Sequence, residues 1–303
     1  MSRIITAGLD GSRESLAAAD WAARESLLRD LPCRLVHAWE QQPYKYPTAY
    51  APPAGQELQR HWAERVPREA EEDLRRRYPS LRVSADQVDG QPVPVLLAAA
   101  DDSELLVIGS RGLSGIGGFL VGSVALSVVA RAAHPVVLVR AEDPAASGLR
   151  PAEPPFGEVV LGLDLRRPSD ALIEFAFDAA ASRTSALRVV HGWSTPAYYG
   201  MDTGFGYTSG AAMSDLGGEL AAQKAIELAE ALRPWREKFP GVEVTETSVT
   251  GGAAHHLVEA ASGAGLLVIG RRSRGSAIGT YLGPVAHAVM HHAASPVAVV
   301  PHD

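Results

Sequence analysis

The chain has 303 residues, of which 46% are hydrophobic, with a formal net charge of −7 and a single cysteine, Cys33. Its length exceeds the ~100 to 200 residues of an ordinary domain, so two domains are expected. The acidic balance argues against nucleic-acid or membrane-surface partners, since both would need a broad basic footprint. One cysteine also excludes an internal disulfide.

The N-terminal residues run directly into a strand-like apolar segment, without the pattern of a signal peptide. No apolar run reaches the ~18 residues of a membrane span. The most apolar segment, residues 121–139, is interrupted by Ser123, Arg131 and His134. With only one cysteine, these features predict a cytoplasmic protein without a membrane partner.

Short β-branched runs in the first half alternate with longer amphipathic segments, which is typical of a parallel sheet flanked by helices. The predicted strands are Ile4–Gly8, Arg34–Trp39, Arg82–Val88, Leu105–Gly109 and Val136–Arg140. The predicted helices cover 12–29, 57–77, 92–102 and 123–133, the first with Leu16, Ala19, Ala23 and Leu27 at helical spacing. Ligands of such folds bind beyond the carboxyl ends of the strands, where Asp10 and Gly109 lie.

The second half repeats the first. "AGLDGS" corresponds to "LGLDLR", "LVHAW" to "VVHGW", and "LLVIG" occurs in both halves. The second copy has a longer loop after His191, and both copies carry tyrosines there, in "PYKYPTAYAPP" and "PAYYGMDTGFGY". The repeat predicts domains at 1–141 and 157–303, joined by a proline-rich linker at 142–156.

The glycine-rich segment "GSRGLSGIGGFLVGS", residues 109–123, joins a predicted strand to a predicted helix. Glycines allow close backbone approach, and helix N-terminal amides with the Ser123 hydroxyl can bind phosphate without lysine. Arg111 would add a charge-assisted contact. None of the lysines, Lys45, Lys224 and Lys238, follows a glycine, so a Walker A loop is excluded. A pliant turn before an ordinary Ser-capped helix is the alternative.

The spacing G-x-x-G, nine residues, then G-[ST] resembles the ATP-binding motif of the universal stress protein family, as do "GLDGS", "LVHAW", "VDGQP" and "HPVVLV". The resemblance covers nearly the whole chain, in tandem form. It implies two α/β domains, each a five-stranded parallel sheet with helices on both faces, Rossmann-like and similar to the adenine nucleotide alpha hydrolases. It also implies ATP, with Mg²⁺, bound in the first half by Leu9, Asp10, Ala38, Ile108, Gly109, Arg111, Gly112, Gly122, Ser123 and Val124.

The second half departs from this motif. Ser273 stands in place of Gly112, and Pro284 in place of Ser123 removes an amide and a hydroxyl. The resemblance therefore implies a weaker second site at Asp164, Gly192, Gly270 and Gly283, although Arg271, Arg272 and Arg274 remain nearby. One tightly bound ATP per chain is expected.

Histidines offer the other candidate chemistry. His287 and His291 are spaced for one helix face, with His292, His255 and His256 in the same half, but no cysteine or carboxylate with ligand spacing accompanies them. Whether a metal binds stays open. His37 and His191 are expected to be core histidines, and Ser123 lacks both a base and a G-x-S-x-G elbow, so no catalytic residue is assigned.

These observations favour an ATP-binding stress-response or dormancy regulator with at most slow hydrolysis, because no base for activating water is identifiable. Two alternatives stay open: an adenylyl-transferring or ATP-hydrolysing enzyme of a related fold, and a scaffold acting through the tyrosine loops. The first lacks the expected S-G-G-x-D-S and H-x-G-H motifs. The terminal runs "HPVVLVRA" and "SPVAVVPH" are predicted edge strands, which invite pairing and a homodimer.

Overall fold

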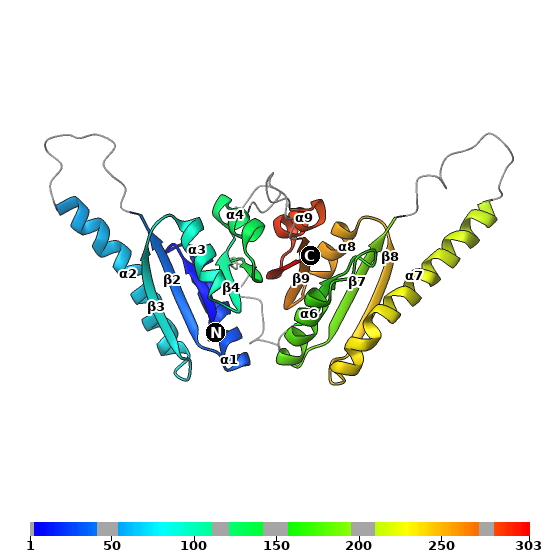
Figure 1. The fold of residues 1–303 in the computed structure, drawn as a ribbon, viewed down its shortest axis with the longest axis horizontal. Coiled ribbons are helices and arrows are strands. Elements are labelled where there is room, and N and C mark those ends of the chain that lie inside the picture. Colours follow the sequence, from blue (N-terminus) through cyan, green and yellow to red (C-terminus); the bar gives the residue numbers. More distant parts are fainter. Residues whose placement is uncertain (1–2, 41–53, 111–120, 142–156, 195–209, 273–281) are drawn as a thin grey trace. The chain divides into compact units, whose positions relative to one another are not determined.

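The computed structural model describes residues 3–40, 54–110, 121–141, 157–194, 210–272 and 282–303, without the side chains of 54–63 and 210–216 (Figure 1). The chain divides into two compact units. Unit 1 comprises Met1–Ala152 with Ser273–Leu282 and Pro296–Pro301, and unit 2 comprises the remainder. The predicted linker and both tyrosine-rich loops lie outside the described residues.

Strands and helices alternate through the first half of the chain, as the sequence predicts (Figure 1). The elements are β1 (Ile5–Leu9), α1 (Arg13–Arg29), β2 (Cys33–Trp39), α2 (Ala54–Arg77), β3 (Val83–Asp89), α3 (Pro92–Asp101), β4 (Leu105–Gly109), α4 (Ser123–Arg131) and β5 (Val136–Val139). Most predicted boundaries lie within two residues of the observed ones.

Helix α1 shows why its sequence begins and ends where it does. Ser12 is the N-cap and accepts a hydrogen bond from the Ser15 amide, while Asp30 ends the helix in the left-handed conformation at φ 50°. The predicted buried face is only partly correct: Ala19 and Ala23 are buried, but Leu16 and Leu27 are 45% and 38% exposed. Small residues and Trp21 form the buried face instead, because α1 packs closely against the sheet.

The sheet of unit 1 has the strand order β3-β2-β1-β4-β5, with every neighbouring pair parallel. The chain runs outward from β1 in one direction through β2 and β3, and then in the other through β4 and β5. The order therefore reverses between β1 and β4, which is where doubly wound sheets bind their ligands.

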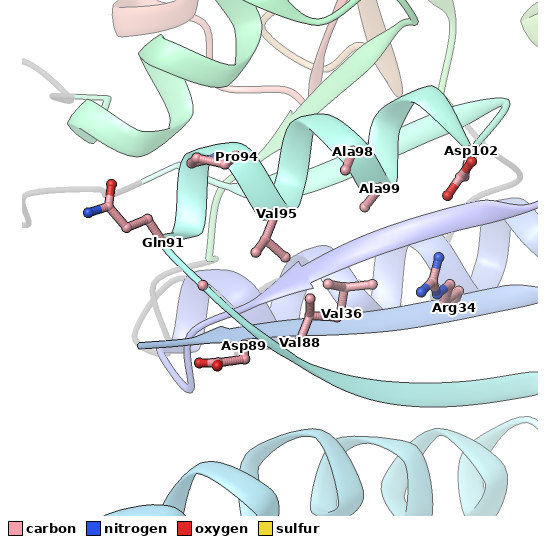
Figure 2. A pocket seen from close by; sticks show the side chains of 11 residues that line it. Arg34, Val36, Val88, Asp89, Gln91, Pro94, Val95, Ala98, Ala99 and Asp102 are labelled. Atoms are coloured by element: carbon pink, nitrogen blue, oxygen red, sulfur yellow. The ribbon is translucent and has the colours of Figure 1, made fainter. Parts of the chain in front are cut away.

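Helices cover both faces of this sheet. Helices α1 and α2 contact each other and one face, while α3 contacts the opposite face and packs against α4. In Figure 2, β2 and β3 lie between α3 and a helix on the far side. Both faces of the central strands are buried, so β1 and β4 are mostly apolar and lack the alternation of a half-exposed strand.

The second half of the chain has the same element order: β6 (Val159–Gly162), α6 (Asp170–Arg183), β7 (Leu187–Trp193), α7 (Gly210–Lys238), β8 (Val244–Thr250), α8 (Ala253–Ala260), β9 (Leu266–Arg272), α9 (Pro284–His292) and β10 (Val297–His302). Within unit 2 the strand order is β9-β6-β7-β8, all parallel. Helix α6 repeats the ends of α1, with an N-cap at Ser169 and a left-handed C-cap at Thr184.

Strand β10 is the departure from a simple tandem arrangement. The segment Pro296–Pro301 belongs to unit 1, where β10 pairs antiparallel with β5 through Val297 opposite Leu138 and Val299 opposite Val136. The two terminal runs therefore pair as the sequence predicts for edge strands. The α/β fold class with parallel sheets is confirmed. No helix in the described part of the chain has both the length and the apolar character of a membrane span.

Candidate functional site

Three strands of unit 1 end side by side at the reversal of strand order. Ala7 is paired with Val107, so Leu9 and Gly109, two residues further along each strand, end at the same level. Leu9 is paired with His37, which places Ala38 beside Asp10. The predicted contacts from β1, β2 and β4 thus share one edge of the sheet, as parallel strands require.

Asp10 and Ser12 form a tight turn after β1. The Asp10 carboxylate accepts hydrogen bonds from the Ser12 amide at 2.9 Å and the Ser12 hydroxyl at 2.5 Å. Gly11 between them has φ +82°, a conformation that favours glycine. This turn fixes an exposed carboxylate at the strand end while Ser12 starts α1.

His37 and His191 hold equivalent positions in the two halves. His37 Nδ1 lies 2.8 Å from the Leu9 carbonyl oxygen, and His191 Nδ1 lies 2.9 Å from that of Leu163. Donation from each ring ties the second strand of the half to the end of its first strand. His191 is buried, as predicted for a core histidine, whereas His37 is only partly buried, and neither is assigned chemistry.

Gly109 has a packing role that the motif alone does not reveal. A Cβ atom there would lie 2.6 Å from the Glu14 carbonyl carbon and 2.8 Å from the Ser15 amide nitrogen. Real Cβ atoms do not approach backbone this closely, so the end of β4 can lie against the first turn of α1 only because residue 109 is glycine. Its neighbours Leu9 and Ile108 are 5% and 4% exposed and form the floor of the strand ends.

The N-terminus of α4 has the form expected of an anion site. Gly122 is the N-cap residue in extended conformation and supplies no side-chain cap, while Ser123 and Val124 are exposed. Gly122 therefore gives the amides of the first turn no side-chain cap, and such amides can bind an anion. Arg111 and Gly112, the other predicted members of the loop, lie outside the described residues.

The corresponding carboxylate in the second half, Asp164, lies in an ion-pair cluster. Arg166 donates to it from its amide at 3.1 Å, from Nε at 3.1 Å and from a terminal guanidinium nitrogen at 3.2 Å. Arg272, at the end of β9, lies 3.6 Å away. Partial burial acts to raise the pKa of Asp164, but the hydrogen bonds and charge of Arg166, with the charge of Arg272, hold that pKa below its ordinary value.

Other positions of the second half also depart from the first. A Cβ on Gly270 would lie 2.5 Å from Nε2 of His302, so the His302 imidazole covers this strand end. Gly192 packs against Ala253, where a Cβ would lie 2.6 Å from the Cα atom. Gly283 is the N-cap of α9 and Pro284 its first residue, so the amide that Ser123 supplies in α4 is missing from α9.

Two of the three arginines that remain near the second site are placed by the structure. Arg271 is only 7% exposed, and its burial lowers the pKa of the guanidinium. Arg272 is paired with Asp164, which offsets its charge. Arg274 and Ser273 lie outside the described residues.

Metal-binding side chains do not converge in the described ranges, where no three His, Cys, Asp or Glu residues are grouped to hold an ion. The rings of His287 and His291 contact each other on α9, with centroids 4.4 Å apart and an interplanar angle of 38°. Cys33 is buried, which raises the pKa of its thiol to about 12 and disfavours the thiolate that a metal would need.

A pocket that the sequence did not predict lies on the α3 side of β2 and β3 (Figure 2). Its volume is about 310 Å³, and it is bounded by α3, by the faces of the two strands and by the turn after β3. The predicted nucleotide residues do not line it. Sequence reasoning also missed Arg166 and His302, and only comparison of the two halves position by position could have singled them out.

Comparison with known proteins identifies one family in both halves of the chain. The model described as "Universal stress protein family" matches residues 1–140 and 155–301. A universal stress protein of Mycobacterium tuberculosis (strain ATCC 25618 / H37Rv) is 30% identical over 303 residues, covering 97% of this chain and 96% of the relative. One of Mycolicibacterium smegmatis (strain ATCC 700084 / mc(2)155) is 31% identical, covering 98% and 96%.

A solved structure shares the fold along the whole chain. The crystal structure of a universal stress protein from Archaeoglobus fulgidus DSM 4304 is 17% identical, with a TM-score of 0.69 and coverage of 100% of both chains. The family model and the curated relatives together span both halves of the sequence. The chain therefore belongs to the universal stress protein family.

Proposed function

We propose that the protein binds one ATP per chain, in its first half, at the edge of the sheet where β1 and β4 diverge. The supporting observation is the uncapped, exposed N-terminus of α4 in the half whose strand ends also present Asp10. A helix N-terminus of this kind favours negative charge through its free amides and its dipole. The phosphates would lie there, against Gly122, Ser123 and Val124.

The other proposed contacts come from residues at the aligned ends of β1, β2 and β4. Asp10, fixed by its bonds to Ser12, would accept hydrogen bonds from the ribose side of the nucleotide. The Ala38 backbone at the end of β2 would contact the adenine, with Leu9 and Ile108 as the apolar floor. Mg²⁺ would offset phosphate charge, since it needs few protein ligands. Arg111, Gly109 and Gly112 complete the proposed site.

The second half supports a single strong site. Asp164 is engaged by Arg166 and Arg272, and Pro284 lacks the amide of the first turn. A nucleotide binding at Asp164, Gly192, Gly270 and Gly283 would have to displace the ion pairs and the His302 imidazole. We therefore propose that this half binds nucleotide weakly or is empty.

The proposed role is regulatory rather than catalytic: nucleotide occupancy would change conformation or association in a stress or dormancy response. No described side chain beside the α4 N-terminus is assigned as a base, so hydrolysis is expected to be slow at most. A homodimer and a cytoplasmic location stay predictions from the sequence. Sedimentation at high concentration tests the first, where a strictly monomeric protein contradicts it.

The decisive experiment is mass spectrometry of nucleotide carried through purification, with titration of ATP by calorimetry, on two matched variants. Gly122→Glu places a carboxylate at the N-terminus of α4, and Gly283→Glu does the same at α9. Both glycines have ordinary extended backbone, at φ −65° and −59°, and a Cβ at Gly283 meets nothing within 4 Å. Neither backbone conformation therefore requires glycine, and Gly283 has room for a side chain.

We expect Gly122→Glu to lose nucleotide through charge repulsion and Gly283→Glu to retain about one equivalent. Two equal sites in the parent protein, or loss only in Gly283→Glu, would refute the assignment. Assaying phosphate and pyrophosphate in the same samples separates the rival functions, because an ATPase releases the first and an adenylyl transferase the second. A protein without nucleotide affinity would favour the scaffold.

A further inference from the structure

The pocket beside α3 has an apolar floor. Val36 of β2 and Val88 of β3 point into it from the sheet, and Val95 of α3 points into it from the helix (Figure 2). Val36 and Val95 are 1% and 9% exposed and pack together with Ala99, while Val88 is half-buried against them. A pocket of about 310 Å³ is near the lower end of the range for small-molecule sites, and a mostly apolar lining with a few polar groups is typical of them.

The charged groups of the pocket lie toward its two ends. Asp89 is the last residue of β3 and lies at one end, and Asp102 follows α3 near Arg34 at the other (Figure 2). Arg34 Nε donates to the Asp86 carboxylate at 2.7 Å, so its charge is already offset. Asp89 and Asp102 thus carry the net charge, and the pocket is negative at both ends with an apolar middle.

Helix α3 strengthens this preference for positive charge. Its first turn contains Pro92 and Pro94, which have no amide hydrogen, and the Val95 amide donates to the Gln91 carbonyl. The helix start therefore offers few donors for an anion. At the other end, the negative pole of the helix lies next to Asp102 and favours a cation there.

We propose that this pocket binds an aliphatic polyamine of the spermidine class, with an ammonium group at each acidic end and the methylene chain on the valines. Asp89 lies two residues before Gln91, and α3 rises roughly 16 Å from Gln91 to Asp102. This span suits an extended triamine. A nucleotide is disfavoured, because its phosphates would meet carboxylates.

The second half of the chain lacks the residues that give the pocket its character in the first half. Its equivalents of Asp89, Val95 and Asp102 are Thr250, His256 and Gly263, so one apolar wall and both acidic ends are absent there. The His256 imidazole instead bonds to the Thr250 carbonyl oxygen at 3.1 Å. The chain itself thus accepts changes at these positions within the same fold.

The test is titration of spermidine by calorimetry at physiological salt, without nucleotide, on the full chain. Asp102→Asn and Asp89→Asn should each weaken binding about fivefold to tenfold, the loss expected for one charge-assisted contact. Asp101→Asn is the matched control, since Asp101 is exposed on the neighbouring helix position and does not line the pocket. Ala98→Leu, at an exposed lining position, should abolish binding by filling the space.

Methyl NMR provides a second readout, with shifts expected for Val36, Val88 and Val95. Absence of saturable spermidine binding would overturn the proposal, as would tighter binding of the neutral 1,8-octanediol. Spermidine binding weakened equally by Asp101→Asn would also overturn it, because that result would indicate diffuse attraction to an acidic protein. Residue 122 lies outside the pocket. The Gly122→Glu variant should therefore bind spermidine as tightly as the parent protein does, whether or not it still binds ATP.

Discussion

At the residue scale, glycines of this chain are required for opposite reasons in different places. Gly109 leaves no room for a Cβ against the first turn of α1, whereas a Cβ on Gly218, an exposed position of α7, meets nothing within 4 Å. The first position is constrained by packing of two backbones. The second carries only the entropic cost of glycine in a helix.

Alanine substitutions should therefore change the free energy of unfolding in opposite directions. Gly109→Ala is expected to destabilise by about 1 to 3 kcal/mol, because β4 and α1 must separate to admit the methyl group. Gly218→Ala is expected to stabilise by about 0.5 to 1 kcal/mol. Urea unfolding followed by circular dichroism measures both, and a neutral Gly109→Ala would contradict the packing account.

The sequence assigned Gly109 to phosphate binding through a motif, and that role stays a prediction. It did not indicate the close contact with Glu14, because nothing in a linear motif identifies which distant backbone lies against a residue. Leu16 and Leu27 illustrate the same limit. Helical spacing placed them on the buried face, but the small residues of α1 allow the closest approach to the sheet, and the leucines are left exposed.

At the element scale, the two halves differ in the contacts that hold the turn after their first strand. In the first half the neutral amide and hydroxyl of Ser12 close the turn after β1 by donating to the Asp10 carboxylate, and in the second the turn after β6 is closed by the charged Arg166. Arg272 adds an ion pair between the ends of β6 and β9. Stability at the second turn therefore depends on the charge of Asp164.

Asp164→Asn should make this dependence visible as a function of pH. The folded-state pKa of Asp164 lies below its ordinary value of 3.8, so its contribution is complete above that pH and disappears as pH falls below it. At pH 7 we expect the variant to be less stable by a few tenths to about 1 kcal/mol, since the group is partly exposed. Thermal or urea unfolding at pH 7 and pH 3 should show the difference shrinking, and a constant difference would contradict it.

The elements themselves were predictable because each half repeats the same alternation of apolar strands and capped helices. Strand positions agree closely, since buried parallel strands give short apolar runs bounded by turn residues. Helix α2 begins at Ala54, three residues before the predicted start at 57. The pocket beside α3 could not be predicted, because it depends on how far a helix lies from the neighbouring strands.

At the scale of the whole molecule, sequence order and spatial grouping diverge at β10. The strand follows the elements of the second half, yet Pro296–Pro301 belongs to unit 1 and pairs with β5. Repeat analysis divides a chain at its linker and cannot show that a terminal strand pairs outside its own repeat. The apolar edge-strand pattern of "SPVAVVPH" was the available signal, since such an edge requires a partner.

The contribution of β10 to unit 1 can be tested with Ala298→Pro. Ala298 is fully buried and lies opposite Val137, and proline there cannot donate to the ladder and fits poorly within a paired strand. Hydrogen exchange should show amide protection in β5 falling about tenfold or more, a loss of about 1.4 kcal/mol, although the substitution lies in the last residues of the chain. Protection in β7, which pairs within unit 2, serves as the internal control. Unchanged protection of β5 would mean that this strand is stable without β10.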